Sequence, residues 1–147
     1  MEVQCEMPDS NPLEEDIKQL LQKSNTIAIV GISRKEDRDS YKVAKYLKEH
    51  GFKIIPVNPV YEEVLGEKCF KSLSDIPFSV DIVDIFRKPE AIPPIVDEAM
   101  KIGAKAVWMQ LGLAHNASAK KAREAGLEVV MNKCIKIEHS RLLRETR

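Results

Sequence analysis

Long hydrophobic runs are absent from this chain of 147 residues. No apolar run approaches the roughly 20 residues that a membrane-spanning helix needs. The acidic start, MEVQCEMPDSNPLEED, has no apolar core of the kind that a secretory signal carries. The formal net charge is zero, so the charge balance does not indicate a protein that coats nucleic acid or an anionic membrane. We therefore expect a cytoplasmic protein with neither of these partners.

Cysteine is also scarce. Cys5, Cys69 and Cys134 are an odd number of thiols, widely spaced and without a C-x-x-C pair. This pattern argues against a disulfide framework and against a zinc site, so we expect reduced thiols and no metal. Cys5 and Cys69 have no neighbouring feature that suggests a function.

The chain does contain short apolar runs that alternate regularly with more polar segments. With 44% hydrophobic and 31% charged residues it has a globular composition, and we predict one domain at residues 11–147 after a flexible tail at residues 1–10. The runs are short and rich in Val and Ile, which is typical of strands buried on both faces of a parallel sheet. The five predicted strands are Thr26–Val30, Lys53–Val57, Val80–Ile85, Ala106–Met109 and Glu128–Met131.

Helical patterns separate these runs. Asn11, Ser40 and Asn116 are the expected N-terminal caps of three helices, and a last helix is expected near Cys134–Glu145. The irregular link after the second strand has one expected helical turn, in SLSD. Alternating strands and helices predict a doubly wound α/β domain. We expect a Rossmann-like three-layer fold with a five-stranded parallel sheet in the order 3-2-1-4-5.

The loop after the first predicted strand is the candidate ligand site, because such sheets bind ligands outside the strand carboxyl ends where the order reverses. Gly31 would let a phosphate approach the backbone, and Ser33 offers a hydroxyl and an amide. The helix that starts near Ser40 adds its positive dipole end. The basic side chains around the loop are Arg34, Lys35, Arg38 and Lys42. The arrangement suits a pyrophosphate; an ordinary solvated loop is the alternative.

Two common nucleotide motifs are missing, namely G-x-G-x-x-G and the Walker A pattern. An NAD site usually has an acidic residue at the end of the second strand, where it accepts a hydrogen bond from the ribose. This chain has Asn58-Pro59 there. A carboxylate would repel a phosphate on the adenosine ribose, whereas an amide among basic residues would not. NADP and coenzyme A (CoA) therefore remain as candidate ligands.

Six segments between Thr26 and Leu142 share a resemblance. In order they are VGIS, SYKVAKYLKEHGFKIIPVNP, LGEKCFKSL, IP followed by VDIVDIFRKPE, VWMQLG and NKCIKIEH. Together they resemble the small stand-alone CoA-binding proteins, which are similar to the nucleotide-binding domain of the succinyl-CoA synthetase α subunit. The resemblance covers nearly the whole predicted domain.

That family implies a Rossmann-like fold that holds CoA across the carboxyl ends of the strands. The phosphates would meet the loop after the first strand and the adenosine would meet the end of the second. Residues after the third strand would close over the nucleotide, and the turn after the fourth would line the site. Carried over in that order, the implied cofactor-binding residues are Gly31, Ile32, Ser33, Arg34 and Lys42, then Asn58 and Pro59, then Phe86, Arg87 and Lys88, then Gln110 and Gly112.

Cys134 is the main candidate for chemistry. It follows the fifth strand beside Lys133 and would start a helix, a setting that favours a thiolate. Such a thiolate could form a mixed disulfide with CoA or contact its pantetheine arm; a small residue at a helix end is the alternative. We expect His50 to be solvated and His139 to form a surface pair with Glu138. The nucleophile elbow G-x-S-x-G is absent.

We therefore expect non-catalytic binding of CoA or acyl-CoA. The synthetase that the family resembles uses a phosphorylated histidine in a following domain and an ATP-grasp partner subunit, so its ligase chemistry should not carry over. Two alternatives stay open: an NADP-dependent oxidoreductase, and a thiol-redox protein that forms a CoA mixed disulfide at Cys134. A homodimer and a larger acyl-CoA enzyme are the protein partners that the sequence leaves open.

Overall fold

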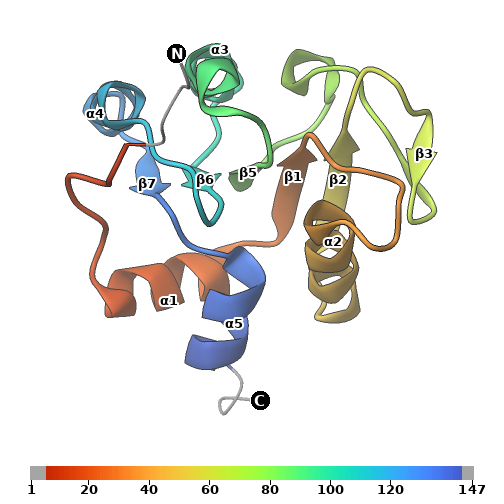
Figure 1. Cartoon of the computed structure of the whole chain (residues 1–147), viewed down its shortest axis with the longest axis horizontal. Helices are drawn as coiled ribbons and strands as arrows, with labels where there is room; N and C mark the ends of the chain where they lie inside the picture. The colour runs from red at the N-terminus through yellow and green to blue at the C-terminus, as the bar shows by residue number, and fades with distance from the viewer. Residues whose placement is uncertain (1–5, 144–147) are drawn as a thin grey trace.

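Five parallel strands form the central sheet of the computed structural model, which describes residues 6–143 (Figure 1). Nearly every strand residue is buried, as expected for strands covered on both faces. The strands are β1 Thr26–Val30, β2 Lys53–Val57, β5 Ile82–Ile85, β6 Ala106–Met109 and β7 Glu128–Val130. β1, β2 and β6 have the predicted bounds, whereas β5 begins later and β7 ends earlier than predicted.

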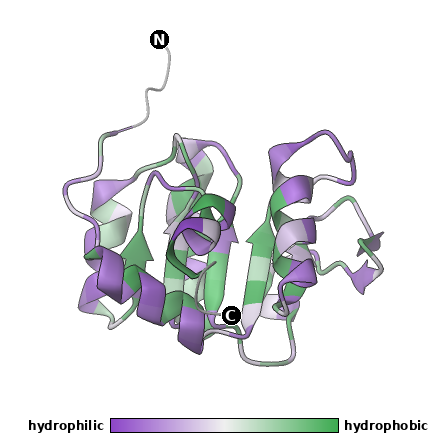
Figure 2. Ribbon diagram, turned by 90° about the horizontal axis from the view of Figure 1, so that it is seen from below, coloured by the Kyte–Doolittle hydropathy of each residue, from purple (hydrophilic) through white to green (hydrophobic). Residues whose placement is uncertain are grey.

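Helices cover both faces of this sheet (Figure 1). One face packs against α1 Glu14–Lys23, α2 Asp39–Glu49 and α5 Ile135–Leu143, and the other packs against α3 Ile92–Lys101 and α4 Asn116–Glu124. In Figure 2 the strands are predominantly hydrophobic and the helices carry hydrophilic residues. The predicted three-layer Rossmann-like α/β fold is confirmed. Within residues 6–143, no helix is long and apolar enough to cross a membrane.

The sheet order is β2-β1-β5-β6-β7. The predicted order 3-2-1-4-5 is met when the segment at Phe70 is counted as the third strand. Phe70 makes an isolated parallel bridge to Val57, on the edge of β2 that faces away from β1. The segment that we predicted as third, now β5, lies on the other side of β1, and β7 follows β6. Successive strands are thus added on one side of β1 and then, from β5 onward, on its other side. The point between β1 and β5 where the strand order reverses is where doubly wound folds form a ligand crevice.

The link between β2 and β5 is the irregular part of the fold. It contains a short antiparallel hairpin, β3 Glu63–Val64 and β4 Glu67–Lys68, which the sequence did not predict. The helical turn expected in SLSD is present as a 3-10 turn at Leu73–Asp75. A second 3-10 turn, Pro89–Ala91, leads into α3.

The predicted caps Asn11 and Asn116 are wrong, because both side chains make contacts distant in sequence. Asn11 Nδ2 donates to the Met131 carbonyl at 2.8 Å, and Asn11 Oδ1 accepts from the Met131 amide at 2.7 Å. Asn116 Oδ1 accepts from the Asp9 amide, and His115 caps α4 instead. Residues 6–10 of the expected tail thus lie along α4, while residues 1–5 and the predicted helix end beyond residue 143 fall outside the described residues.

The expected surface pair of Glu138 and His139 is also wrong, since both side chains are buried. α5 packs against α1 and α2, and this places His139 among aromatic rings. The Tyr46 hydroxyl lies 2.8 Å from His139 Nδ1. His50, expected to be solvated, is partly buried and stacks on Tyr46 with 3.9 Å between ring centroids.

Candidate functional site: a cleft at the carboxyl ends of the strands

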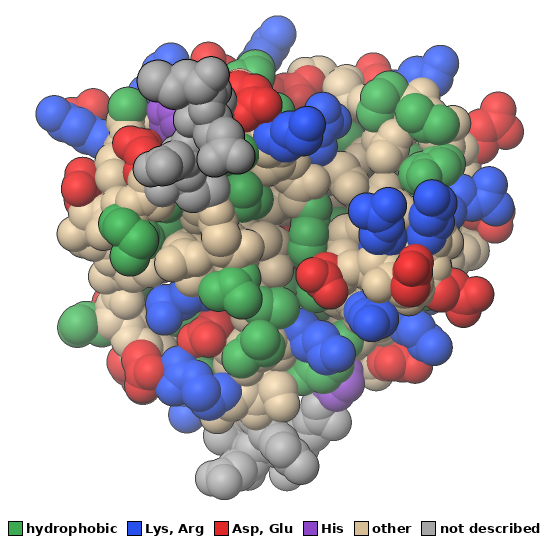
Figure 3. Space-filling model, in the orientation of Figure 1, with side chains coloured by type: hydrophobic (Ala, Val, Ile, Leu, Met, Phe, Trp, Pro, Cys, Tyr) green, Lys and Arg blue, Asp and Glu red, His purple; other side chains and the backbone are tan. Residues whose placement is uncertain are grey.

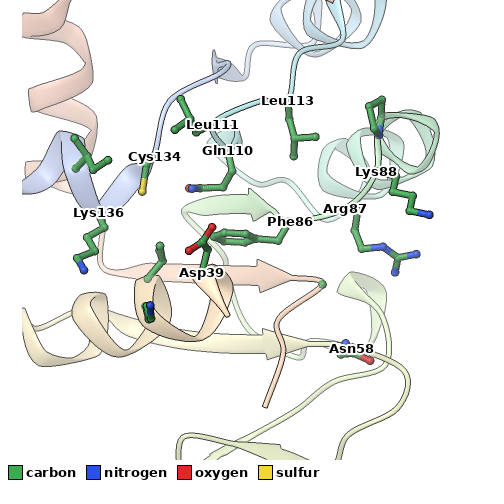
Figure 4. Close-up of a pocket in the computed structure, with 15 residues that line it drawn as sticks. Asp39, Asn58, Phe86, Arg87, Lys88, Gln110, Leu111, Leu113, Cys134 and Lys136 are labelled. Atoms are coloured by element: carbon green, nitrogen blue, oxygen red, sulfur yellow. The ribbon is translucent and has the colours of Figure 1, made fainter. Parts of the chain in front are cut away.

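A cleft of about 950 Å³ opens at the carboxyl ends of β1, β5 and β6 (Figure 4). It lies where the strand order reverses, as the fold predicts. Its wall contains eight of the thirteen predicted ligand-binding residues: Gly31, Lys42, Asn58, Phe86, Arg87, Lys88, Gln110 and Cys134.

The other five predicted residues, including Pro59, do not line this cleft. The Ile32 side chain is fully buried in the core beneath it. The Arg34 guanidinium lies 5.8 Å from the centroid of the Tyr61 ring. The Ser33 amide donates to Ser40 Oγ at 2.9 Å, so Ser40 shapes the loop rather than capping α2, whose N-cap is Arg38. The remaining residue is Gly112, whose amide donates to Asn132 Oδ1.

Gly31 has a structural reason to be glycine. Its φ is +86°, and a Cβ added there would lie 2.4 Å from the Phe86 carbonyl oxygen. Its amide donates to the Val57 carbonyl at 2.9 Å, and the Phe86 amide donates to the Val30 carbonyl at 2.9 Å. The ends of three strands are therefore held together at this glycine. The sequence suggested that Gly31 admits a phosphate, but the close approach here is that of the β5 backbone.

Asn58 joins the turn after β2 to the loop after β1. Its Nδ2 donates to the Ile32 carbonyl and its Oδ1 accepts from the Val60 amide, both at 2.9 Å. A carboxylate at this position has no donor for the Ile32 carbonyl. The amide thus has a structural role in addition to the electrostatic one that the sequence suggested.

The far end of the cleft is built by β6 and the start of α5. Gln110 is buried, and its Oε1 accepts from the Ile135 amide at 3.1 Å. The Trp108 indole donates to the Lys133 carbonyl at 2.8 Å. Between these two anchors lies Cys134, a half-buried free thiol directly before α5.

Seven wall residues were not predicted: Asp39, Val43, Pro89, Leu111, Leu113, Lys136 and Ile137. Four cations and one carboxylate, Asp39, face the cleft, so its electrostatic balance is positive. In Figure 4, Arg87 and Lys88 lie at one end while Cys134 and Lys136 lie at the other. On the face shown in Figure 3, basic and acidic side chains are interspersed rather than gathered by sign.

Asp84 and Cys69 are titratable side chains that lie in the core. Asp84 of β5 is fully buried, and neither of its carboxylate oxygens has a hydrogen-bond partner within residues 6–143. Burial raises its pKa well above the ordinary value. Asp84 was not predicted as a notable residue, although an acid within an apolar strand is a visible signal. Burial also raises the pKa of the Cys69 thiol, which fits a structural residue. Cys5 lies outside the described residues.

A family model described as the CoA binding domain matches residues 25–140 of the chain. The chain belongs to the CoA-binding domain family. The family predicted from the six sequence segments is therefore confirmed. Among residues 6–143 of this CoA-binding domain, no cluster of three or more His, Cys, Asp or Glu side chains is placed to hold a metal ion.

Three relatives show how far the similarity extends. The domain is 40% identical over 130 residues to the uncharacterized protein YneT of Bacillus subtilis (strain 168), covering 88% of this chain and 96% of YneT. A solved hypothetical protein from Pyrococcus horikoshii OT3 is 47% identical with a TM-score of 0.88, covering 97% of this chain and 99% of that one. An ADP-forming acetate–CoA ligase of Methanocaldococcus jannaschii is 36% identical over 80 residues, which span 54% of this chain and only 11% of the ligase.

Proposed function

We propose that this protein binds CoA or an acyl-CoA in the cleft at the carboxyl ends of β1, β5 and β6, in the cytoplasm and without chemistry of its own. The observation that carries the proposal is the polarity of the cleft in a chain of this family. Arg87 and Lys88 lie at one end, and the Cys134 thiol lies at the other with apolar neighbours and Lys136. CoA has the same polarity, with phosphates at one end and a thiol at the other.

The cationic end suits the phosphates of CoA. Arg87 and Lys88 follow β5, and the N-terminus of α2 adds a favourable dipole. Lys42, in the first turn of α2, is a further cation of the cleft wall. Asn58 lies on the same side and would border the adenosine. The pantetheine arm would then pass between Phe86 and Gln110 toward Cys134.

Binding without catalysis is supported by the composition of the wall. Among the residues that line the cleft there is no histidine, and the one carboxylate, Asp39, comes from the first turn of α2. The described residues of the cleft wall thus include no histidine–carboxylate pair of the kind that enzymes place around a reacting bond. The ligases that share this domain are far longer, and the matched segment is a small part of them.

Titration calorimetry with CoA, dephospho-CoA and NADPH tests the proposal. CoA should bind tightest, and Arg87→Ala and Lys88→Ala should each weaken it about 10- to 100-fold, the usual effect of losing a hydrogen bond to a charged group. Lys101→Ala, a matched change of an exposed lysine outside the cleft, should leave binding unchanged. Absence of CoA binding, or tighter binding of NADPH, would overturn the proposal.

A second candidate function, thiol exchange, is favoured by the position of Cys134 at the thiol end of the cleft. The Cys134 thiolate would attack CoA disulfide, forming a bond to one sulfur and releasing the other half as CoA thiolate. Intact mass spectrometry after incubation with CoA disulfide should then show one added CoA. The adduct should be absent in Cys134→Ser and retained in Cys69→Ser, because Cys69 is buried. An adduct that persists in Cys134→Ser would exclude this function.

A further inference from the structure

Large apolar side chains are exposed at the thiol end of the cleft. Leu111, in the turn after β6, is 66% exposed, and Ile137, in the first turn of α5, is 53% exposed. Both line the cleft together with Leu113 and Cys134. In Figure 4, Leu111 and Leu113 project from the segment after β6 on the same side of the cleft as Gln110. Leu111 and Ile137, with Leu113 nearer the middle of the cleft, form an apolar rim beside the place where the thiol of CoA would end.

The rim is more apolar than free CoA requires. Free CoA ends in a thiol, which adds little apolar surface for two exposed branched side chains to cover. Scattered exposed apolar residues need no explanation, but here they share one cleft with cations at its opposite end. A ligand that matches both ends carries phosphates at one end and an apolar group at the other.

One cation belongs to the thiol end, and its position bears on the kind of acyl group. The Lys136 ammonium lies 5.7 Å from the centroid of the Tyr46 ring. A cation at this distance from an aromatic face is already stabilised by it. The contact leaves the Lys136 charge in place, but the three side chains of the rim, Leu111, Leu113 and Ile137, are apolar, and these favour an apolar acyl group.

We propose that the apolar rim formed by Leu111, Leu113 and Ile137 holds the acyl group of an acyl-CoA thioester. The preferred ligand is then a thioester with a short aliphatic acyl group, bound more tightly than free CoA. This inference rests on the proposed function and names the class of ligand for the same cleft.

The expected preference follows from the burial of methylene groups. Each methylene moved out of water contributes about 0.8 kcal/mol, which is about fourfold in the dissociation constant. Butyryl-CoA has two more methylenes than acetyl-CoA, so full coverage by the rim would tighten binding by about 15-fold. An exposed rim covers part of the chain, and a four- to tenfold preference is the expected range for partial coverage.

Titration calorimetry on the full chain with CoA, acetyl-CoA, butyryl-CoA and succinyl-CoA tests this inference. Butyryl-CoA should bind tightest, and succinyl-CoA should gain nothing over acetyl-CoA. Leu111→Ser and Ile137→Ser should each reduce the preference for butyryl-CoA, measured as the ratio of the dissociation constants of free CoA and butyryl-CoA. Leu13→Ser, which changes an exposed leucine outside the cleft, is the matched control and should alter neither value.

Three results would overturn the inference while leaving the proposed function intact: equal binding of CoA and butyryl-CoA, tighter binding of succinyl-CoA, or a butyryl preference that survives in both serine variants. Failure of every CoA compound to bind would instead reject the proposed function and the inference with it. Because Leu111 and Ile137 are exposed, both variants should fold, and thermal unfolding beside the unmodified chain checks this.

Discussion

Asp84 offers a direct test of the core beneath the cleft. It lies in β5 between Ile29 of β1 and Trp108 of β6, on the same sheet face as Phe86 two residues later. Its side chain is fully buried, and neither oxygen has a partner among the described residues. Replacing Asp84 with asparagine keeps the size and polarity of the side chain but removes its ability to ionise. The variant therefore separates the cost of a buried charge from the cost of a buried polar group.

The sign of the effect follows from the direction of the pKa shift. Burial raises the pKa of Asp84 in the folded protein, while the unfolded chain keeps a value of about 3.9. Between these two values the native state binds a proton that the unfolded state has lost. The free energy of unfolding therefore falls as the pH rises through this window, by up to about 1.4 kcal/mol per pH unit. Above the folded pKa the contribution levels off.

Urea unfolding at pH 4.5, 5.5 and 6.5 measures this effect. The free energy of unfolding of Asp84→Asn minus that of the unmodified chain should increase with pH, by up to about 1.4 kcal/mol per pH unit. The cost of the unpaired asparagine amide, about 1–3 kcal/mol, does not depend on pH and cancels in the comparison. Other titrating groups are common to both proteins. A difference that stays constant across this pH range would refute the assignment of Asp84 as a buried neutral acid.

Three further predictions concern stability, each measured by urea unfolding. Gly31→Ala should cost more than Gly126→Ala: both have positive φ, worth about 1–2 kcal/mol, but only at Gly31 does a Cβ meet the carbonyl of Phe86. Burial raises the pKa of Asp81, but two backbone amides and a lysine outweigh it and lower the pKa overall. The unmodified chain should therefore lose stability as the pH falls below about 4, and this loss should be smaller in Asp81→Asn. Trp108→Phe should lower the free energy of unfolding by about 1–3 kcal/mol, because loss of the indole N–H leaves the Lys133 carbonyl without its donor.

The sheet could be predicted well because its strands depend on local composition. β1, β2 and β6 have the predicted bounds, since short runs of Val and Ile between polar segments leave few alternatives. The helix caps could not be predicted in the same way. Asn11 binds Met131, which lies 120 residues later, and Asn116 binds the segment before α1. A side chain that suits a cap locally is free to make a distant contact, and the sequence does not show which of the two it makes.

In the candidate site, too, the residues that could be predicted are those placed by local sequence, and the others are placed by contacts with other segments. Residues directly after strands, such as Gly31 and Phe86, line the cleft because parallel strands bring their carboxyl ends to one edge. Ser33 and Arg34 come from the same loop but are held by contacts with Ser40 and Tyr61. Asp39, Leu111 and Ile137 were missed because their direction depends on how a helix or turn is oriented. Residue spacing does not specify that orientation.

The contacts around the cleft also determine which groups are available to a phosphate. The Gly31 amide is used by Val57 and the Ser33 amide by Ser40, so two of the loop amides that the sequence suggested as phosphate donors already have partners. The phosphate contacts of the proposed complex must then come largely from side chains, chiefly Arg87 and Lys88. Since strand-end hydrogen bonds already hold the backbone on which these side chains stand, CoA would order two long side chains rather than a loop. The entropic cost of binding would be correspondingly small.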